Sequence, residues 1–166
     1  MLMPVLCFSV RLCYNAFMRN LTATPFTSRS NCGRLEEQMR ELDMDTLMFF
    51  DAHRDALPIF TALEAKLYEH FPEMQKRVQK TQITYYHKHV FACVSFARVR
   101  RKAELPESWL TLTLGLPYAL DSARVAVKTE VYPGRWTTHF VIGSPEELDE
   151  ELLSWIEQAY VFSERK

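Results

Sequence analysis

Glycine is scarce in this sequence, with four residues among 166. Neither GxGxxG nor GxxxxGK[ST] occurs, and the loops that cradle nucleotide phosphates are built on such glycines. The net charge of -1 provides no long-range field that would draw a polyanion to the whole surface. These absences exclude the common glycine-rich phosphate sites and a globally basic nucleic-acid-binding protein.

Cysteine pairs with metal-binding spacing are also missing. Cys7, Cys13, Cys32 and Cys93 form no CxxC stretch, and we expect all four to be reduced in a cytoplasmic protein. The apolar opening has no basic start, and Arg11 interrupts it. We therefore expect neither a signal peptide nor a membrane anchor.

The composition favours one globular domain, since 48% of the residues are hydrophobic and 166 residues suffice for a core. Residues 21–33 are rich in Ser, Thr and Asn and break the periodicity, which is typical of a linker. We predict a poorly ordered extension and linker over residues 1–43 and a single domain over 44–166. Deleting 1–43 should leave the melting temperature almost unchanged.

Two stretches have apolar residues at helical spacing. The first follows Asp55, an expected N-cap, and tolerates Pro58 in its first turn. The second follows Ser144, with Pro145 at the first helical position and Glu147 closing a capping box. The predicted buried stripes are Ile59, Phe60, Leu63, Leu67 and Phe71 in the first, and Leu148, Leu152, Trp155, Ile156 and Ala159 in the second.

Alternating β-branched and aromatic residues predict strands elsewhere. Residues 81–98 read as a hairpin turning at Lys88 and His89, and residues 109–114 as a further strand. In the hairpin, the expected core face is Ile83, Tyr85, Ala92, Val94 and Phe96, and the expected opposite face is Thr84, Tyr86, Phe91, Cys93 and Ser95. In the further strand, Leu110, Leu112 and Leu114 should point inward.

The clearest hairpin spans residues 123–142, because Pro133-Gly134 suits the centre of a type II turn. Regular pairing across it predicts Val131 opposite Trp136, Lys128 opposite His139 and Glu130 opposite Thr137. The fold class is therefore α+β: an antiparallel sheet of about five strands with two main helices packed on one face.

Within "RWTTHF", the alternation places Trp136, Thr138 and Phe140 under the helices, and Arg135, Thr137 and His139 on the other face. That face carries more aromatic side chains than a face that only meets water needs, and Trp, Tyr and Arg are frequent binding anchors. We expect a non-catalytic domain that binds a small ligand or a protein, with homodimerisation as its simplest form and no cofactor. The expected binding residues are Tyr86, Trp109, Lys128, Glu130, Arg135 and His139.

Three alternatives stay open. A basic cluster next to aromatic residues could bind single-stranded nucleic acid; it comprises Arg98, Arg100, Arg101 and Lys102. His87, His89 and His139 could gather around a metal, although hairpin-tip histidines are more simply solvated. Cys93 and His139 could react together only if their strands are adjacent. The acidic run at residues 146–151 is explained by the dipole of the following helix.

Several stretches resemble the bacterial domain-of-unknown-function family 5655, over roughly residues 46–164. They include "KTQITYYHKHVFACVSFARVRRK", "LTLTLGLPYALDSARV" and "YPGRWTTHFVIGSPEELDEELLSWIEQAY". Members of that family often have two adjacent histidines where this chain has Thr138-His139, which weakens any role for a histidine pair. The resemblance implies a small cytoplasmic α+β domain, similar to proteins that include proposed iron chaperones, and it implies no particular reaction.

Overall fold

The computed structural model describes residues 42–165. All neighbouring strands pair antiparallel in one six-stranded sheet, with the order β1-β2-β3-β4-β6-β5. The strands are β1 (Gln75–Val78), β2 (Gln82–Tyr86), β3 (Val90–Ser95), β4 (Leu110–Leu116), β5 (Val125–Tyr132) and β6 (Arg135–Ile142). The extra strand relative to the sequence prediction is β1, whose Gln-Lys-Arg-Val sequence carries no apolar alternation.

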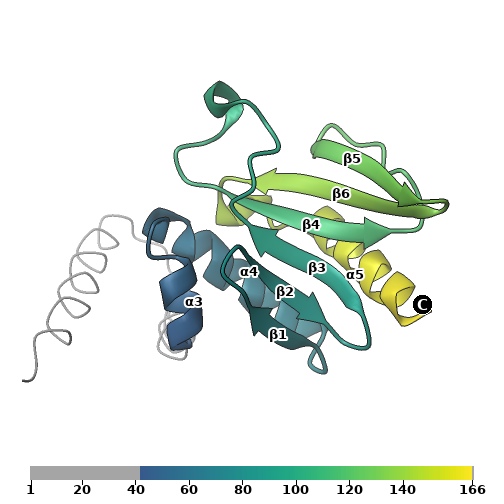
Figure 1. Cartoon of the computed structure of the whole chain (residues 1–166), viewed down its shortest axis with the longest axis horizontal. Helices are drawn as coiled ribbons and strands as arrows, with labels where there is room; N and C mark the ends of the chain where they lie inside the picture. Colours follow the sequence, from purple (N-terminus) through teal and green to yellow (C-terminus); the bar gives the residue numbers. More distant parts are fainter. Residues whose placement is uncertain (1–41, 166) are drawn as a thin grey trace, which may run out of the picture. The chain divides into compact units, whose positions relative to one another are not determined.

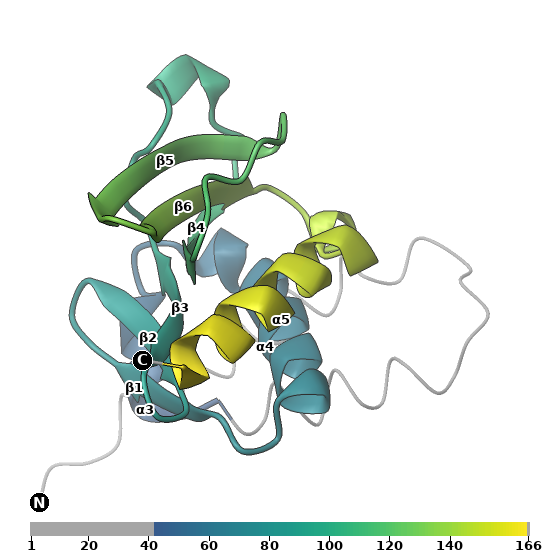
Figure 2. The same ribbon diagram turned by 90° about the vertical axis from the view of Figure 1, so that its right-hand side faces the viewer.

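Helices α4 (Leu57–His70) and α5 (Glu150–Glu164) lie on the same face of the sheet, which we call the helix face (Figures 1 and 2). A shorter helix, α3 (Met44–Phe49), precedes them, and three-residue 3-10 turns occur at η2 (Arg54–Ala56), η3 (Lys102–Glu104) and η4 (Pro145–Glu147). The predicted α+β class with two main helices on one face is confirmed.

The core lies between the helix face and helices α4 and α5. Every second residue of the central strands is fully buried there, and the Phe140 ring stacks on Trp155 of α5 with centroids 5.3 Å apart. Each large apolar side chain buried in this way contributes roughly 1.5–3 kcal/mol. The buried sheet residues include Ile83, Tyr85, Ala92, Val94, Leu110, Leu112, Leu114, Phe140 and Ile142.

Both predicted helix starts are wrong in detail. Asp55 lies inside η2, and α4 begins after Ala56, which has no side chain able to cap it. Ser144 makes no capping bond, and the residues after it form only η4. Helix α5 starts at Glu150, because Asp149 accepts the Leu152 N–H at 3.0 Å and so provides the stronger cap.

The β5–β6 hairpin turns at Pro133-Gly134 as predicted, and Gly134 has φ +71°, which a residue with a Cβ rarely adopts. The predicted register is wrong, because β5 has irregularities between Val125 and Val127 and between Glu130 and Tyr132. An extra residue in one strand reverses the faces of the residues beyond it. Regular pairing would place Val127 and Val131 under the helices with Trp136 and Phe140, but they are 39% and 51% exposed.

A further irregularity, in the β2–β3 hairpin, explains why Phe91 does not lie on the predicted face. The β2–β3 register shifts between Tyr85 and Tyr86, so that Tyr86 pairs with Val90. Phe91 is consequently buried on the helix side, where its ring contacts Phe71 and Tyr160. The rest of the predicted β2–β3 pairing is confirmed.

The predicted extension over residues 1–43 lies, up to residue 41, outside the described residues. Its last residue, Asp43, is part of the fold: it caps α3 by accepting the Thr46 N–H at 2.7 Å. Cys93 is a free thiol, and the other three cysteines lie outside the described range.

Candidate ligand pocket

The sheet surface opposite the helices, which we call the open face, has a polar row across its centre. Cross-strand neighbours Thr84, Cys93, Thr113 and His139 form this row, which ends at Val127 of β5. The Thr113 hydroxyl and His139 Nδ1 are hydrogen-bonded at 2.9 Å, and the Cys93 thiol lies 3.9 Å from the Thr84 hydroxyl. The polar groups of the row are therefore largely paired with one another.

No reactive pair arises in this row. Strand β4 lies between Cys93 on β3 and His139 on β6, so the adjacency needed for a Cys–His pair is absent. Burial raises the pKa of the Cys93 thiol, which disfavours the nucleophilic thiolate. Burial also lowers the pKa of His139, which favours the neutral imidazole.

The predicted binding residues are not brought together. Lys128 lies opposite Thr138 and Glu130 opposite Trp136, so both belong to the helix side of β5 and not to the face of His139. The Lys128 ammonium donates to the Leu120 carbonyl at 3.1 Å, and the Glu130 carboxylate accepts the Gly134 N–H at 3.0 Å. The two β5 irregularities are the physical reason for this correction.

The other three predicted binding residues lie in three different places. Tyr86 lies near the opposite edge of the sheet, with the Arg77 guanidinium 5.3 Å from its ring centroid. Arg135 is exposed at the β5–β6 turn. Trp109, directly before β4, lies in a pocket instead.

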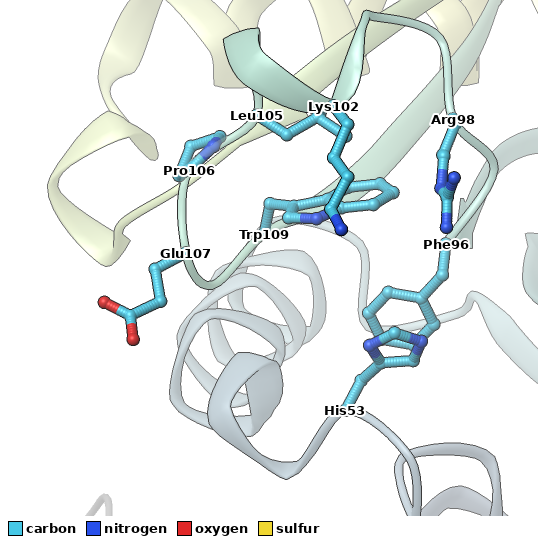
Figure 3. Close-up of a pocket in the computed structure, with 8 residues that line it drawn as sticks. All are labelled: His53, Phe96, Arg98, Lys102, Leu105, Pro106, Glu107 and Trp109. Atoms are coloured by element: carbon cyan, nitrogen blue, oxygen red, sulfur yellow. The ribbon is translucent and has the colours of Figure 1, made fainter.

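This pocket, the aromatic pocket, has a volume of about 400 Å³ at the end of the sheet where β3 ends and β4 begins (Figure 3). Its wall combines three aromatic rings with two cations and a carboxylate. The lining residues are His53, Phe96, Arg98, Lys102, Leu105, Pro106, Glu107 and Trp109. Small-molecule sites typically have volumes of roughly 300–1,000 Å³ and a few polar groups on an apolar wall.

Aromatic packing fixes one side of the pocket. The His53 imidazole stacks on Phe96 with centroids 4.0 Å apart, and Trp109 meets Phe96 edge-on at 6.1 Å. Phe96 in turn contacts Phe49 and Phe50 of the α3 segment, at 5.4 Å each. The rings are therefore held by the fold before any ligand arrives.

The charged groups of the pocket have no partners among residues 42–165. The side chains of Arg98, Lys102 and Glu107 take part in no hydrogen bond or ion pair with another described residue. All three side chains are exposed, so among the described residues their charges face solvent and remain available to a ligand.

An ion-pair network secures α3, whose following residues form the His53 side of the pocket. The Lys76 ammonium of β1 lies 2.8 Å from Asp43 and 2.9 Å from Glu64 of α4. Burial alone would raise the pKa of Asp43, but hydrogen bonds from Lys76 and Thr46 outweigh it and lower the pKa to about 2. Burial raises the pKa of Glu64 against the opposing effect of Lys76. The network joins α3 to the sheet and to α4.

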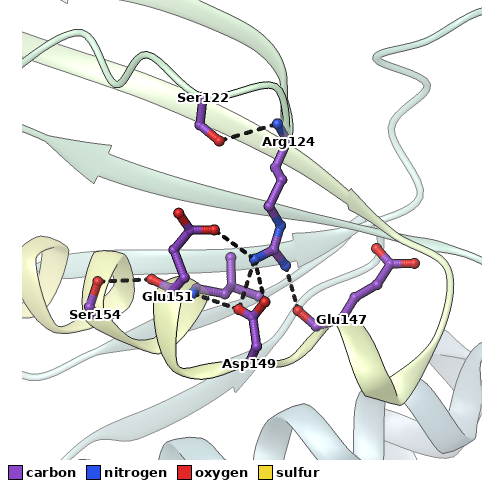
Figure 4. Close-up of polar contacts among 7 residues, drawn as sticks. Ser122, Arg124, Glu147, Asp149, Glu151 and Ser154 are labelled. Atoms are coloured by element: carbon purple, nitrogen blue, oxygen red, sulfur yellow. Dashed lines mark hydrogen bonds and ion pairs between the residues drawn. The ribbon is translucent and has the colours of Figure 1, made fainter.

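The acidic run at residues 146–151, which was expected to interact with the dipole of the following helix, also has a cationic partner, Arg124 (Figure 4). Its guanidinium lies 2.7 Å from Asp149 and 3.2 Å from Glu151. The Arg124 bond and the Leu152 N–H lower the pKa of Asp149. This cluster fastens the start of α5 beside β5, which agrees with the structural interpretation of the run.

The three histidines considered for a metal are not gathered. His87 Nδ1 lies 2.6 Å from Glu164 and His89 Nδ1 3.1 Å from the Ser163 carbonyl, both at the end of α5, while His139 belongs to the open-face row. In residues 42–165, no three His, Cys, Asp or Glu side chains are grouped as metal ligands.

Sequence reasoning named Trp109, Arg98 and Lys102, but in two separate hypotheses. It missed His53 and Glu107 and placed Phe96 in the core. The only available signal was the proximity of Phe96, Arg98, Lys102 and Trp109 in the chain, within 14 residues. His53 is brought in from more than 40 residues away.

Comparison with known proteins gives one match. No curated protein and no solved structure matches the chain. None of the helices in residues 42–165 has the length and apolar character needed to cross a bilayer. A family model described as a domain of unknown function, DUF5655, matches residues 48–163, which include the whole aromatic pocket. The chain therefore belongs to the DUF5655 family.

Proposed function

We propose that this chain is a binding domain that holds a small planar anion in the aromatic pocket. The observation that carries the proposal is the combination of preformed aromatic walls with two exposed cations, Arg98 and Lys102, whose side chains have no partner within residues 42–165. A planar ring would lie against Trp109 or the His53–Phe96 stack, and its anionic group would accept hydrogen bonds from the two cations.

Isothermal titration calorimetry with 1-naphthyl phosphate tests this proposal, with inorganic phosphate as the comparison that lacks a ring. We expect saturable binding of the naphthyl compound, weakened about tenfold by Arg98→Ala because a charge-assisted hydrogen bond is lost. Arg101→Ala is the matched control, since Arg101 belongs to the same loop but does not line the pocket.

Two results would contradict the proposal. One is the absence of any heat of binding for 1-naphthyl phosphate. The other is an equal loss of affinity in the Arg98→Ala and Arg101→Ala proteins, which would mean that the loop acts only through its general positive charge.

Nucleic-acid binding is the second candidate, because two cations of the basic loop flank an aromatic ring at Trp109. Against it, the loop does not form one track: Arg100 lines a different pocket, of about 170 Å³, together with Arg124. Strand-binding grooves follow the backbone continuously. Oligonucleotide binding that falls steeply with salt and requires both Arg100 and Arg101 would favour this second candidate.

A further inference from the structure

Strand β5 lies at one margin of the sheet and has a free side. The strand order ends in β4-β6-β5, so β6 covers one side of β5 and, among residues 42–165, no strand covers the other (Figure 1). Within the described residues, its one backbone bond outside this pairing joins the Val125 N–H to the Ser122 carbonyl, at 3.1 Å. An edge strand of this kind presents N–H and C=O groups with which another strand can pair.

The two edges of the sheet differ in how well they are protected against such pairing. The other edge is β1, which has four residues, two of them the cations Lys76 and Arg77. Short length and positive charge block an edge, and pairing of β1 with its own copy would bring these cations together. Strand β5 has eight residues, and Val127, Val131 and Tyr132 on it are exposed. The exposed apolar side chains therefore lie at the longer and less protected edge.

The two irregularities of β5 do not reach its middle. They lie between Val125 and Val127 and between Glu130 and Tyr132, and residues 127–130 pair with β6 in regular order. A bulge disrupts a ladder only locally. Regular pairing on the free side can therefore be built on residues 127–130.

The middle of β5 is complementary to a second copy of itself. In an antiparallel pair with a two-fold axis at Thr129, Lys128 lies opposite Glu130 of the second copy. Val127 then lies opposite Val131 of the second copy. An axis at Lys128 or at Glu130 would instead place two like charges opposite each other, which is destabilising. Among these three registers, the charges therefore select the one centred on Thr129.

Both charged side chains can reach a second copy. An ammonium has three donors, and that of Lys128 uses two of them, toward the Leu120 carbonyl and the fully exposed Asp121. One oxygen of the exposed Glu130 carboxylate accepts the Gly134 N–H. Among the described residues, a donor of Lys128 and an oxygen of Glu130 thus remain for a pair between copies.

We infer that two copies of this chain associate through β5, in an antiparallel pair centred on Thr129 that joins their six-stranded sheets into one continuous sheet. The Lys128–Glu130 pair occurs twice because the interface is symmetric. None of the residues that line the aromatic pocket belongs to β5, so this inference is independent of the proposed function.

Sedimentation equilibrium of the full-length protein, repeated over a wide range of concentration, tests the association. We expect a reversible monomer–dimer equilibrium. Lys128→Glu and Glu130→Lys each place like charges opposite each other twice, so each should weaken self-association at least about tenfold. In an equimolar mixture of the two variants, every opposed pair again has opposite charges, and dimers should return with about the affinity of the wild-type protein.

Lys88→Glu is the matched control, since it makes the same change of charge at an exposed residue between β2 and β3. Its self-association should stay within about twofold of wild type. A wild-type protein that remains monomeric at every concentration would overturn the inference. So would a single β5 variant that dimerises as well as wild type, or a mixture that associates no more tightly than either variant alone.

Amide hydrogen exchange of the wild-type protein is a second measurement, and it needs no variant. The N–H groups of β5 that point away from β6 should exchange more slowly at concentrations where the dimer forms than in dilute solution. Exchange in β5 that does not change as the protein associates would place the interface elsewhere and overturn the inference.

Discussion

The open-face row and the aromatic pocket both contain polar side chains beside exposed surface, yet they differ in what those side chains contact. In the row, Thr113 bonds His139, and Cys93 lies close to Thr84. In the pocket, the side chains of Arg98 and Lys102 bond no other described residue. The comparison teaches that residue type alone does not mark a binding surface; unused hydrogen-bonding capacity next to a shaped apolar wall is the better criterion.

The largest expected effect comes from the ion-pair network near the pocket. Lys76→Met should lower the free energy of unfolding by about 3 kcal/mol, because it leaves the largely buried Glu64 without its cation. Ligand affinity should fall too, since α3 and the His53 segment lose their attachment. Urea unfolding and calorimetry with 1-naphthyl phosphate measure the two effects.

Thr113→Val is the contrasting change on the open face, and it should lower stability by only about 1 kcal/mol without altering ligand affinity. Arg124→Met is the matched control for removing a cation, and its exposed pairs should contribute less than about 1 kcal/mol. If Lys76→Met were no more harmful than Arg124→Met, the structural importance assigned to the buried network would be wrong.

An intermediate effect is expected at the indole of the pocket. Trp109→Ala should weaken binding of 1-naphthyl phosphate about tenfold, in line with the loss of one stacking surface. Trp136→Ala removes an indole from β6, outside the pocket, and should leave the affinity within about twofold of wild type. Similar losses in both proteins would place the ligand elsewhere or indicate general destabilisation.

The smallest effect concerns pH. The folded-state pKa of Asp43, about 2, is below its ordinary value of 3.8, so its stabilisation is complete above pH 3.8 and is lost as the pH falls toward 2. The raised pKa of Glu64 acts in the opposite sense and partly offsets this loss, because protonation of that group favours the folded state.

Asp43→Asn keeps the cap on α3 and removes the charge. Urea unfolding at a series of acidic pH values should therefore show a flatter decline than in the wild-type protein. An unchanged slope would mean that Asp43 is not the group that titrates.

The helix face could be predicted from the sequence because its signal is strictly periodic. Leu110, Leu112 and Leu114 alternate with threonines, and burial on one side requires that alternation. The open face was less predictable. Irregularities in β5 and beside Tyr86 change which residues share a face, and they depend on pairing between strands that no local pattern specifies.

The predictions of where the helices begin failed for a different reason. Ser144-Pro145-Glu146-Glu147 and Asp149-Glu150-Glu151 are competing N-terminal signals, and the structure uses the second for α5. The aromatic pocket was beyond sequence reasoning as a whole, because its wall depends on the path of an irregular loop and on contact with His53 after α3.

Backbone amide and indole chemical shifts, recorded while 1-naphthyl phosphate is added to ¹⁵N-labelled protein, test the central claim most directly. The account predicts that the perturbed signals belong to the Trp109 indole and to the backbone around His53, Phe96 and Arg98, while those of Thr113 and His139 stay in place. Perturbations centred on Thr113, His139 and Cys93, with an unmoved Trp109 indole, would contradict it and return the binding site to the open face.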